Sequence, residues 1–152
     1  MNITKNNSIK NFLSTKLGIK LIRRLMVDGK KNKAEKILLG TLNLLAESSS
    51  ENPIVILKSA IRHTKPLIEV RTIRVRGTNY QVPIPIFSKR RTSLAIKWII
   101  ENARKKKGNS MKYKLRDEFL LAYKNQGESV KKKINIHKLA TANRAYTHFR
   151  WF

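Results

Sequence analysis

The chain has 152 residues, 41% of them hydrophobic, which is enough apolar material for one folded domain with a modest core. Its 34 lysines and arginines face only nine acidic residues, so the net charge of +25 requires a counter-charge from outside the chain. There is no cysteine, which excludes disulfides and thiolate chemistry, and no apolar run reaches the roughly 18 to 20 residues of a membrane-spanning helix.

The N-terminal part is predicted to be a short tail followed by a helix. Residues 1–11 are polar, basic and rich in asparagine, and we expect a mobile segment there, ahead of a single domain over residues 12–152. A first helix is predicted from Phe12 to Val27. Its apolar stripe consists of Leu17, Leu21 and Leu25. On another face lie Lys16, Lys20 and Arg23, which for an isolated helix we interpret as solvated surface.

Two further helices are indicated by their start signals. Asn32 followed by Glu35 resembles a capping box and predicts a helix over residues 33–47. Asn52 as the cap and Pro53 at the first helical position predict the next helix, because proline is tolerated there. Its inward side is expected to consist of Leu57, Ala60 and Ile61.

Residues 67–87 change to the period of two that is typical of strands, and they predict a β-hairpin arm. The turn is expected at Gly77-Thr78-Asn79. Pro83 and Pro85 cannot donate to a ladder, so the return strand suits a two-stranded arm or an edge. A hairpin alone is marginal in water, and the arm must lean on helices or on a partner.

The rest of the chain predicts three helices over residues 90–107, 111–124 and 129–149. The core face of the first consists of Ala95, Ile96, Ile99, Ile100 and Ala103. The apolar side of the last is expected to consist of Leu139, Ala142, Tyr146 and Phe149. The predicted fold is therefore mainly α, a single-domain bundle of about six helices with a protruding two-stranded β-hairpin arm.

The sequence offers little for catalysis. Its histidines, His63, His137 and His148, do not have the spacing of metal ligands. It has no glycine-rich phosphate loop, no nucleophile elbow and no Cys/His pair. We therefore expect no enzyme, no metal and no cofactor.

The cations instead favour a polyanion. Each basic cluster taken singly fits a solvated face as well as a contact with a polyanion. Together the clusters indicate a nucleic-acid partner, because cations that neutralise its phosphates release bound counterions. Two rivals stay open: a DNA-binding protein that places the helix of residues 90–107 in a major groove, and a protein of membrane surfaces. The aromatic residues are interpreted as packing residues before base-stacking ones. They are Tyr80, Trp98, Tyr146, Phe149 and Trp151.

Four segments resemble signature segments of a known family, the seventh protein of the bacterial-type small ribosomal subunit. They are LMVDGKKNKAEKI (25–37), PLIEVRTIRVRGTNYQVPI (66–84), RRTSLAIKWIIENARKKKGNSM (90–111) and KKKINIHKLATANRAYTHFRW (131–151). The resemblance covers nearly everything after about Leu13. It implies a helical bundle with a β-arm that binds the 3′ major domain of small-subunit ribosomal RNA and helps nucleate assembly of the head.

The resemblance also implies partners and site residues. The protein would lie near exit-site transfer RNA and the messenger path, contact the eleventh small-subunit protein, and form neither a homo-oligomer nor a membrane contact. The residues that it implies in RNA binding are Lys30, Lys31, Arg71, Arg74, Arg76, Arg90, Arg91, Arg104 and Lys105. Met111 and Arg144 lie in matching segments and complete the RNA-binding set.

The chain differs from the family pattern in two places. Arg76 stands where the family has the first of two glycines at the turn of the arm, and the arginine-rich N-terminal extension is largely absent. The ending HFRWF resembles mitochondrial members, so we expect a mitochondrial ribosome, with plastid and bacterial cytoplasm as alternatives.

Overall fold

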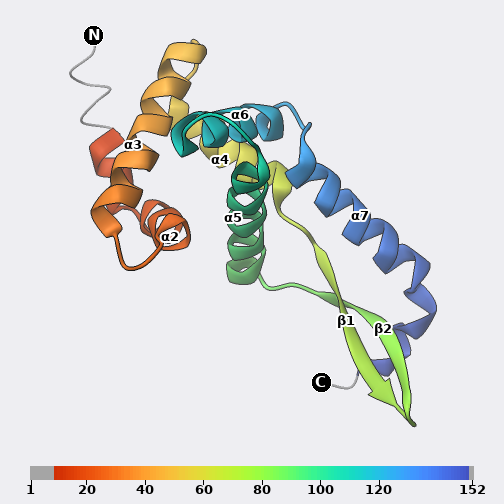
Figure 1. Cartoon of the computed structure of the whole chain (residues 1–152). Helices are drawn as coiled ribbons and strands as arrows, with labels where there is room; N and C mark the ends of the chain where they lie inside the picture. The colour runs from red at the N-terminus through yellow and green to blue at the C-terminus, as the bar shows by residue number, and fades with distance from the viewer. Residues whose placement is uncertain (1–8, 151–152) are drawn as a thin grey trace.

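The structure is a computed structural model that describes residues 9–150, and it has a helical bundle from which a two-stranded arm projects (Figure 1). This confirms the predicted fold class. The helices are α2 (Lys16–Leu25), α3 (Lys31–Ser48), α4 (Pro53–Thr64), α5 (Ser88–Lys105), α6 (Met111–Tyr123), α7 (Glu128–Ala142) and the 3-10 helix η1 (Arg144–Phe149), and the strands are β1 (Ile68–Val75) and β2 (Thr78–Pro85).

The core is assembled around α6, which contacts α3, α4 and α5. Leu42 of α3, Leu57 of α4 and Phe119 of α6 are all fully buried. The predicted core face of α5 is confirmed, because Ile99 and its apolar neighbours on that face are buried as well. These apolar stripes hold the bundle together through the removal of hydrocarbon from water. Within residues 9–150 no helix is both long and apolar enough to cross a membrane.

Residues 9–11, which belong to the N-terminal segment expected to be mobile, are helical, and residues 1–8 of that segment lie outside the described part. Ile9 and Phe12 are each only 4% exposed, because they join the core. The predicted first helix is also interrupted at Thr15, whose Oγ1 accepts a hydrogen bond from the backbone N–H of Gly18 at 3.2 Å. Thr15 is therefore the cap from which α2 begins.

The two predicted caps have opposite outcomes. At α4 the prediction is confirmed, since Asn52 Oδ1 accepts from the N–H of Ile54 at 3.0 Å. At α3 the capping box is wrong, because the helix begins at Lys31 and Asn32 already lies inside it. Glu35 pairs instead with the ammonium of Lys31 at 3.5 Å, as ions one turn apart do.

The arm is an antiparallel pair whose register runs from Ile68 opposite Pro85 to Val75 opposite Thr78. The turn consists of Arg76 and Gly77, with φ of 48° and 84°, and not of Gly77-Thr78-Asn79. Two-residue hairpin turns with positive φ at both positions match the twist of the flanking strands. Arg76 therefore occupies a backbone conformation that a glycine would adopt with less strain.

The C-terminal helix is shorter than predicted. It ends at Ala142, where Asn143 caps it, and η1 turns towards the arm. The rings of Tyr146 and Phe149 lie 5.1 and 5.0 Å from the ring of Tyr80 on β2. The apolar side predicted for this helix is wrong at Leu139 and Ala142, which are both exposed, whereas Tyr146 and Phe149 pack on the arm rather than on the bundle. The arm thus lies beside α7 and η1 (Figure 1).

Candidate nucleic-acid interface

The root of the arm brings two predicted site residues together on one carboxylate. Arg71 Nε donates to Glu69 Oε1 at 2.7 Å, and Arg90 Nε donates to Glu69 Oε2 at 2.8 Å. Burial alone would raise the pKa of Glu69, but the hydrogen bonds and charges of Arg90 and Arg71 outweigh burial and lower this pKa below its usual 4.5. One negative charge thus lies between two arginines, and a net positive charge is left at the junction of β1 and α5.

Arg91 fixes the same junction from the other side. Its Nε donates to the carbonyl oxygen of Ile86 at 2.7 Å, and the N–H of Ile86 donates to the carbonyl of Leu67 at 3.1 Å. Ile86 itself is buried. Arg91 is half-buried, so it contributes to the architecture of the junction as well as to its charge.

A groove between α2 and α5 continues this positive region. It has a volume of about 330 Å³ and is lined by Lys20, Arg23, Arg24, Ser93 and Ile96, with no carboxylate among them. Lys20 Nζ donates to the carbonyl of Lys89 at 3.1 Å, and Arg104 donates to the carbonyl of Leu25 at 3.1 Å. These two contacts hold α2 against both ends of α5, because each joins a long side chain of one helix to the backbone of the other.

The groove and the arm root together form what we call the basic face. Its members are Lys20, Arg23, Arg24, Arg71, Lys89, Arg90, Arg91 and Arg104. Within residues 9–150 nine lysines and arginines form ion pairs with carboxylates, against 34 such residues in the whole chain. Most of the cations therefore have no partner among the described carboxylates, and this is the charge distribution of a polyanion-binding surface.

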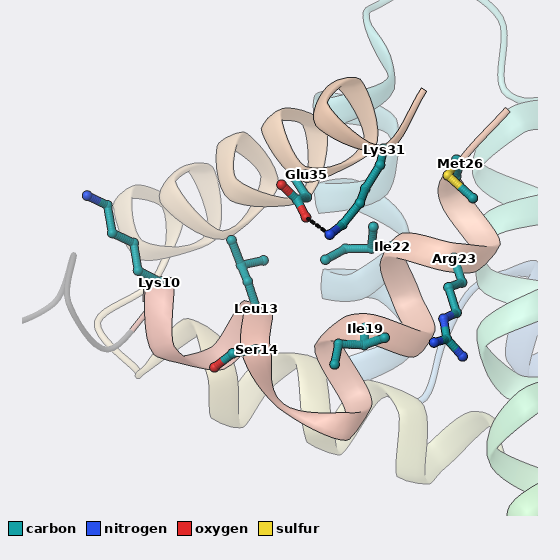
Figure 2. Close-up of a pocket in the computed structure, with 9 residues that line it drawn as sticks. All are labelled: Lys10, Leu13, Ser14, Ile19, Ile22, Arg23, Met26, Lys31 and Glu35. Atoms are coloured by element: carbon teal, nitrogen blue, oxygen red, sulfur yellow. Dashed lines mark ion pairs between the residues drawn. The ribbon is translucent and has the colours of Figure 1, made fainter. Parts of the chain in front are cut away.

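Lys30 and Lys31 lie in and after the turn that follows α2, and both are paired with acids. Lys30 Nζ is 3.9 Å from Asp28 Oδ2, and both side chains are exposed. Lys31 lines a second groove, of about 660 Å³, between residues 9–14, α2 and α3, and Figure 2 shows its ion pair with Glu35 there. Because Glu35 neutralises one of its cations, this groove is less positive than the groove between α2 and α5.

Arg74 and Arg76 occupy the end of the arm. Both are exposed, and neither side chain has a hydrogen bond or ion pair within residues 9–150. Their charges are available to a partner, but the structure does not bring them to the basic face.

The other predicted site residues are dispersed. Lys105 ends α5 in an exposed position, and Arg144 begins η1 beside the arm, also exposed. Met111 is half-buried against the core at the start of α6. Its position favours packing, because a thioether offers no charge to a phosphate.

Four members of the basic face are absent from the predicted set. They are Lys20, Arg23, Arg24 and Lys89. The spacing of Lys20, Arg23 and Arg24 places them on one side of a helix, which is a signal present in the sequence. What the sequence lacks is the proximity of this side to the start of α5, and without that proximity the stripe is indistinguishable from a solvated surface.

The aromatic residues and histidines do not form a site of their own. Trp98 is buried, and Tyr80, Tyr146 and Phe149 form the cluster between the arm and η1, as the packing interpretation expects. Trp151 lies outside the described residues. In the part of the chain that the structure describes, no group of three or more potential metal ligands gathers.

Comparison with known proteins gives consistent matches. A family model described as "Ribosomal protein S7p/S5e" matches residues 3–144. The chain is 48% identical over 132 residues to the small ribosomal subunit protein uS7 of Thermotoga maritima, covering 87% of this chain and 85% of that protein. It is 52% identical over 132 residues to uS7 of Petrotoga mobilis, with the same coverage. It is 47% identical over 133 residues to uS7m of Reclinomonas americana, covering 88% and 84%. The matched residues include the whole basic face.

Proposed function

The chain belongs to the ribosomal protein S7p/S5e family, and on this premise we propose that it binds small-subunit ribosomal RNA through the basic face. The chain is a structural constituent of the small ribosomal subunit, and its family is not an enzyme family. The observation that carries the RNA proposal is the groove between α2 and α5, because three cations line it and no carboxylate does.

The mechanism is phosphate neutralisation combined with recognition of shape. Five cations of the basic face are fixed by hydrogen bonds from their side chains to backbone carbonyls or to Glu69, and they are Lys20, Arg71, Arg90, Arg91 and Arg104. Contacts between these cations and RNA phosphates would position the protein on the RNA backbone without reading the bases. Binding should displace counterions, which makes the affinity strongly dependent on salt.

The arm supports a finer proposal. Arg74 and Arg76 project at its end without partners among the described residues, so they suit a contact away from the basic face. We assign the basic face to the 3′ major domain of the RNA, with a role in nucleating head assembly. We assign the end of the arm to the region of exit-site transfer RNA, messenger RNA and the eleventh small-subunit protein.

The compartment is a separate part of the proposal. Relatives of nearly equal identity include bacterial uS7 proteins and one named uS7m. We propose that the chain belongs to a mitochondrial ribosome, and the residues that support this are the aromatic sequence HFRWF. Cosedimentation of the protein with small subunits from purified mitochondria tests this, and recovery only with ribosomes of another compartment would overturn it.

Filter binding to a transcript of the 3′ major domain tests RNA binding. The logarithm of the affinity should fall by roughly 0.7 to 0.9 units per log unit of salt for each neutralised phosphate. Replacement of Arg23 and Arg24 by glutamine should weaken binding and reduce this slope. The matched control replaces Lys36 of α3 and Lys58 of α4, which are also exposed and helical but lie outside the basic face. Equal losses in the two variants would show that only net charge matters.

The two rival functions are tested with the same protein. Duplex DNA should compete poorly against the transcript at equal phosphate concentration, and efficient competition would favour the DNA-binding alternative. Flotation with anionic lipid vesicles should leave the protein unbound when the transcript is present. Retention on the vesicles would favour a membrane surface.

A further inference from the structure

Phe87 has an exposure that the fold does not explain. It connects β2 to α5, and its side chain is 86% exposed, the highest value among the exposed large hydrophobic residues within residues 9–150. The segment that carries it crosses from the arm to the start of α5 in Figure 1. A phenylalanine normally buries most of its ring, and a ring that is 86% exposed offers its apolar π face to another molecule.

The backbone around this ring is held on both sides. The carbonyl of Phe87 accepts from the N–H groups of Arg90 and Arg91, each at 3.0 Å. The preceding residue, Ile86, is buried and bonded through its N–H to Leu67 and through its carbonyl to Arg91. The ring is therefore presented from a fixed point, and with only two rotatable bonds it loses little entropy on binding.

The surroundings of the ring indicate the chemistry of its partner. Lys89 and Arg90 lie two and three positions after it and are exposed, and the ammonium of Lys20 donates to the backbone carbonyl of Lys89. The nearby carboxylate of Glu69 is already bonded to Arg71 and Arg90. A ligand that suits Phe87 and these cations offers a flat apolar face and carries negative charge beside it. An unpaired nucleotide has both, since its base is a π surface and its phosphates are anionic.

We propose that Phe87 is a stacking platform for an unpaired RNA base, with Lys89 and Arg90 neutralising the adjoining phosphates. The proposal rests on the proposed function, because it adds a base contact to a surface that otherwise contacts only phosphates. It also gives the basic face a preference for single-stranded over fully paired RNA, since a base within a duplex cannot reach the ring.

Substitutions at Phe87 separate stacking from charge. Phe87→Ala should weaken binding of the 3′ major domain transcript roughly 5- to 150-fold, the range for loss of one aromatic–base stack. The salt slope should not change, because no charge is removed. Phe87→Trp should bind at least as tightly as the wild type, and Phe87→Leu should resemble Phe87→Ala. The matched control is Val55→Ala on α4, which also removes an exposed apolar side chain and should bind as the wild type does.

A pair of oligonucleotides tests the base directly. The wild type should bind a single-stranded uridine oligonucleotide more tightly than an abasic oligonucleotide of equal length, and Phe87→Ala should lose most of this difference. Tryptophan emission of Phe87→Trp should be quenched by the uridine oligonucleotide beyond the quenching measured for the wild type, which reports on Trp98 and Trp151 together.

Several results would overturn the proposal. The first is that Phe87→Ala or Phe87→Leu binds the transcript with the affinity of the wild type. The second is that Phe87→Ala weakens binding of the uridine and the abasic oligonucleotide by the same factor. Weakened incorporation of Phe87→Ala into small subunits with intact RNA affinity would show a protein contact instead. Salt-dependent binding by the wild type with no effect of Phe87→Ala removes the stacking proposal alone. Absence of wild-type binding to the transcript removes the proposed function and the stacking proposal together.

Discussion

The carboxylate of Glu69 on β1 lies 2.8 Å from the guanidinium of Arg90 on α5, and this contact ties the arm to the helical bundle. The two residues are 21 positions apart in the chain. Arg71 binds the other oxygen of the same carboxylate. The orientation of the arm is therefore coupled to the position of the charges on α5. A substitution of Glu69 should change both.

Glu69→Gln should lower the free energy of unfolding by about 1 kcal/mol at neutral pH. Hydrogen bonds to charged groups contribute about 1.5 to 3 kcal/mol, and we discount this because both arginines are about half exposed. The pKa of Glu69 is lowered on folding, so its contribution is complete above the usual 4.5 and is lost as the pH falls through the lowered value. Urea unfolding of both proteins over a pH series should show the difference at neutral pH and its disappearance in acid.

His137 should make the attachment of α7 to the arm sensitive to pH. Its Nε2 accepts a hydrogen bond from the N–H of Leu67 at 3.1 Å, which only the neutral ring can do. Burial, and then the charge of Lys133, lower the pKa of His137 below its usual 6.5. The unfolded chain therefore takes up this proton at a higher pH than the folded chain does. Stability should be full above pH 6.5, fall as the pH decreases towards the lowered pKa, and become constant below it.

The control for this pH effect is His137→Gln. Its amide oxygen can accept from Leu67 but does not titrate, so thermal unfolding should lose the corresponding step between the two pKa values. An unchanged pH profile in the variant would assign the step to another group.

Glu118→Ala should be strongly destabilising. This carboxylate is fully buried, lies 2.9 Å from Lys106 Nζ, and accepts from the hydroxyl of Ser129 at 2.5 Å. Its removal leaves the buried hydroxyl of Ser129 without its acceptor, which costs about 1 to 3 kcal/mol, and it also breaks the pair with Lys106, whose side chain is 32% exposed. The matched control is Glu128→Ala, which breaks an exposed pair with Lys131 and should cost at most about 1 kcal/mol. Chemical denaturation measures the two free energies of unfolding. If both variants lose the same amount, the burial of Glu118 does not increase its contribution to stability.

Substitution of Arg74 and Arg76 at the end of the arm should affect RNA binding alone, whereas substitution of Arg91 at its root should also affect stability. Arg74→Ala combined with Arg76→Ala should leave the thermal stability unchanged, because both side chains are exposed and unpartnered among the described residues. Their loss should reduce the salt slope of RNA binding by up to about 1.5 units if both contact phosphates. Arg91→Ala should instead lower the stability, because it removes the hydrogen bond to the carbonyl of Ile86. It should also lower the RNA affinity, because it removes one positive charge from the basic face. A large loss of stability in the double variant would make the arm arginines structural.

The sequence by itself determined the local features of this protein. The net charge, the apolar period of α5, the proline-initiated start of α4 and the two-stranded arm follow from residues that are close together in the chain. Each of these signals is short-range, because a helix or hairpin repeats over a few residues and a cap acts within one turn. The resemblance to the ribosomal family, now confirmed, likewise rests on contiguous segments.

Only the tertiary structure decided which charged and aromatic groups meet. Lys20 reaches the backbone of Lys89, and Tyr146 reaches Tyr80, across separations that no periodic pattern encodes. The apolar stripe of α2 predicts that one side is buried, but it does not say which helix covers that side or which cations then line the groove. The exposure of Phe87 is likewise known only from the structure, because the sequence IPIFS predicts an apolar residue there but does not say whether it is buried.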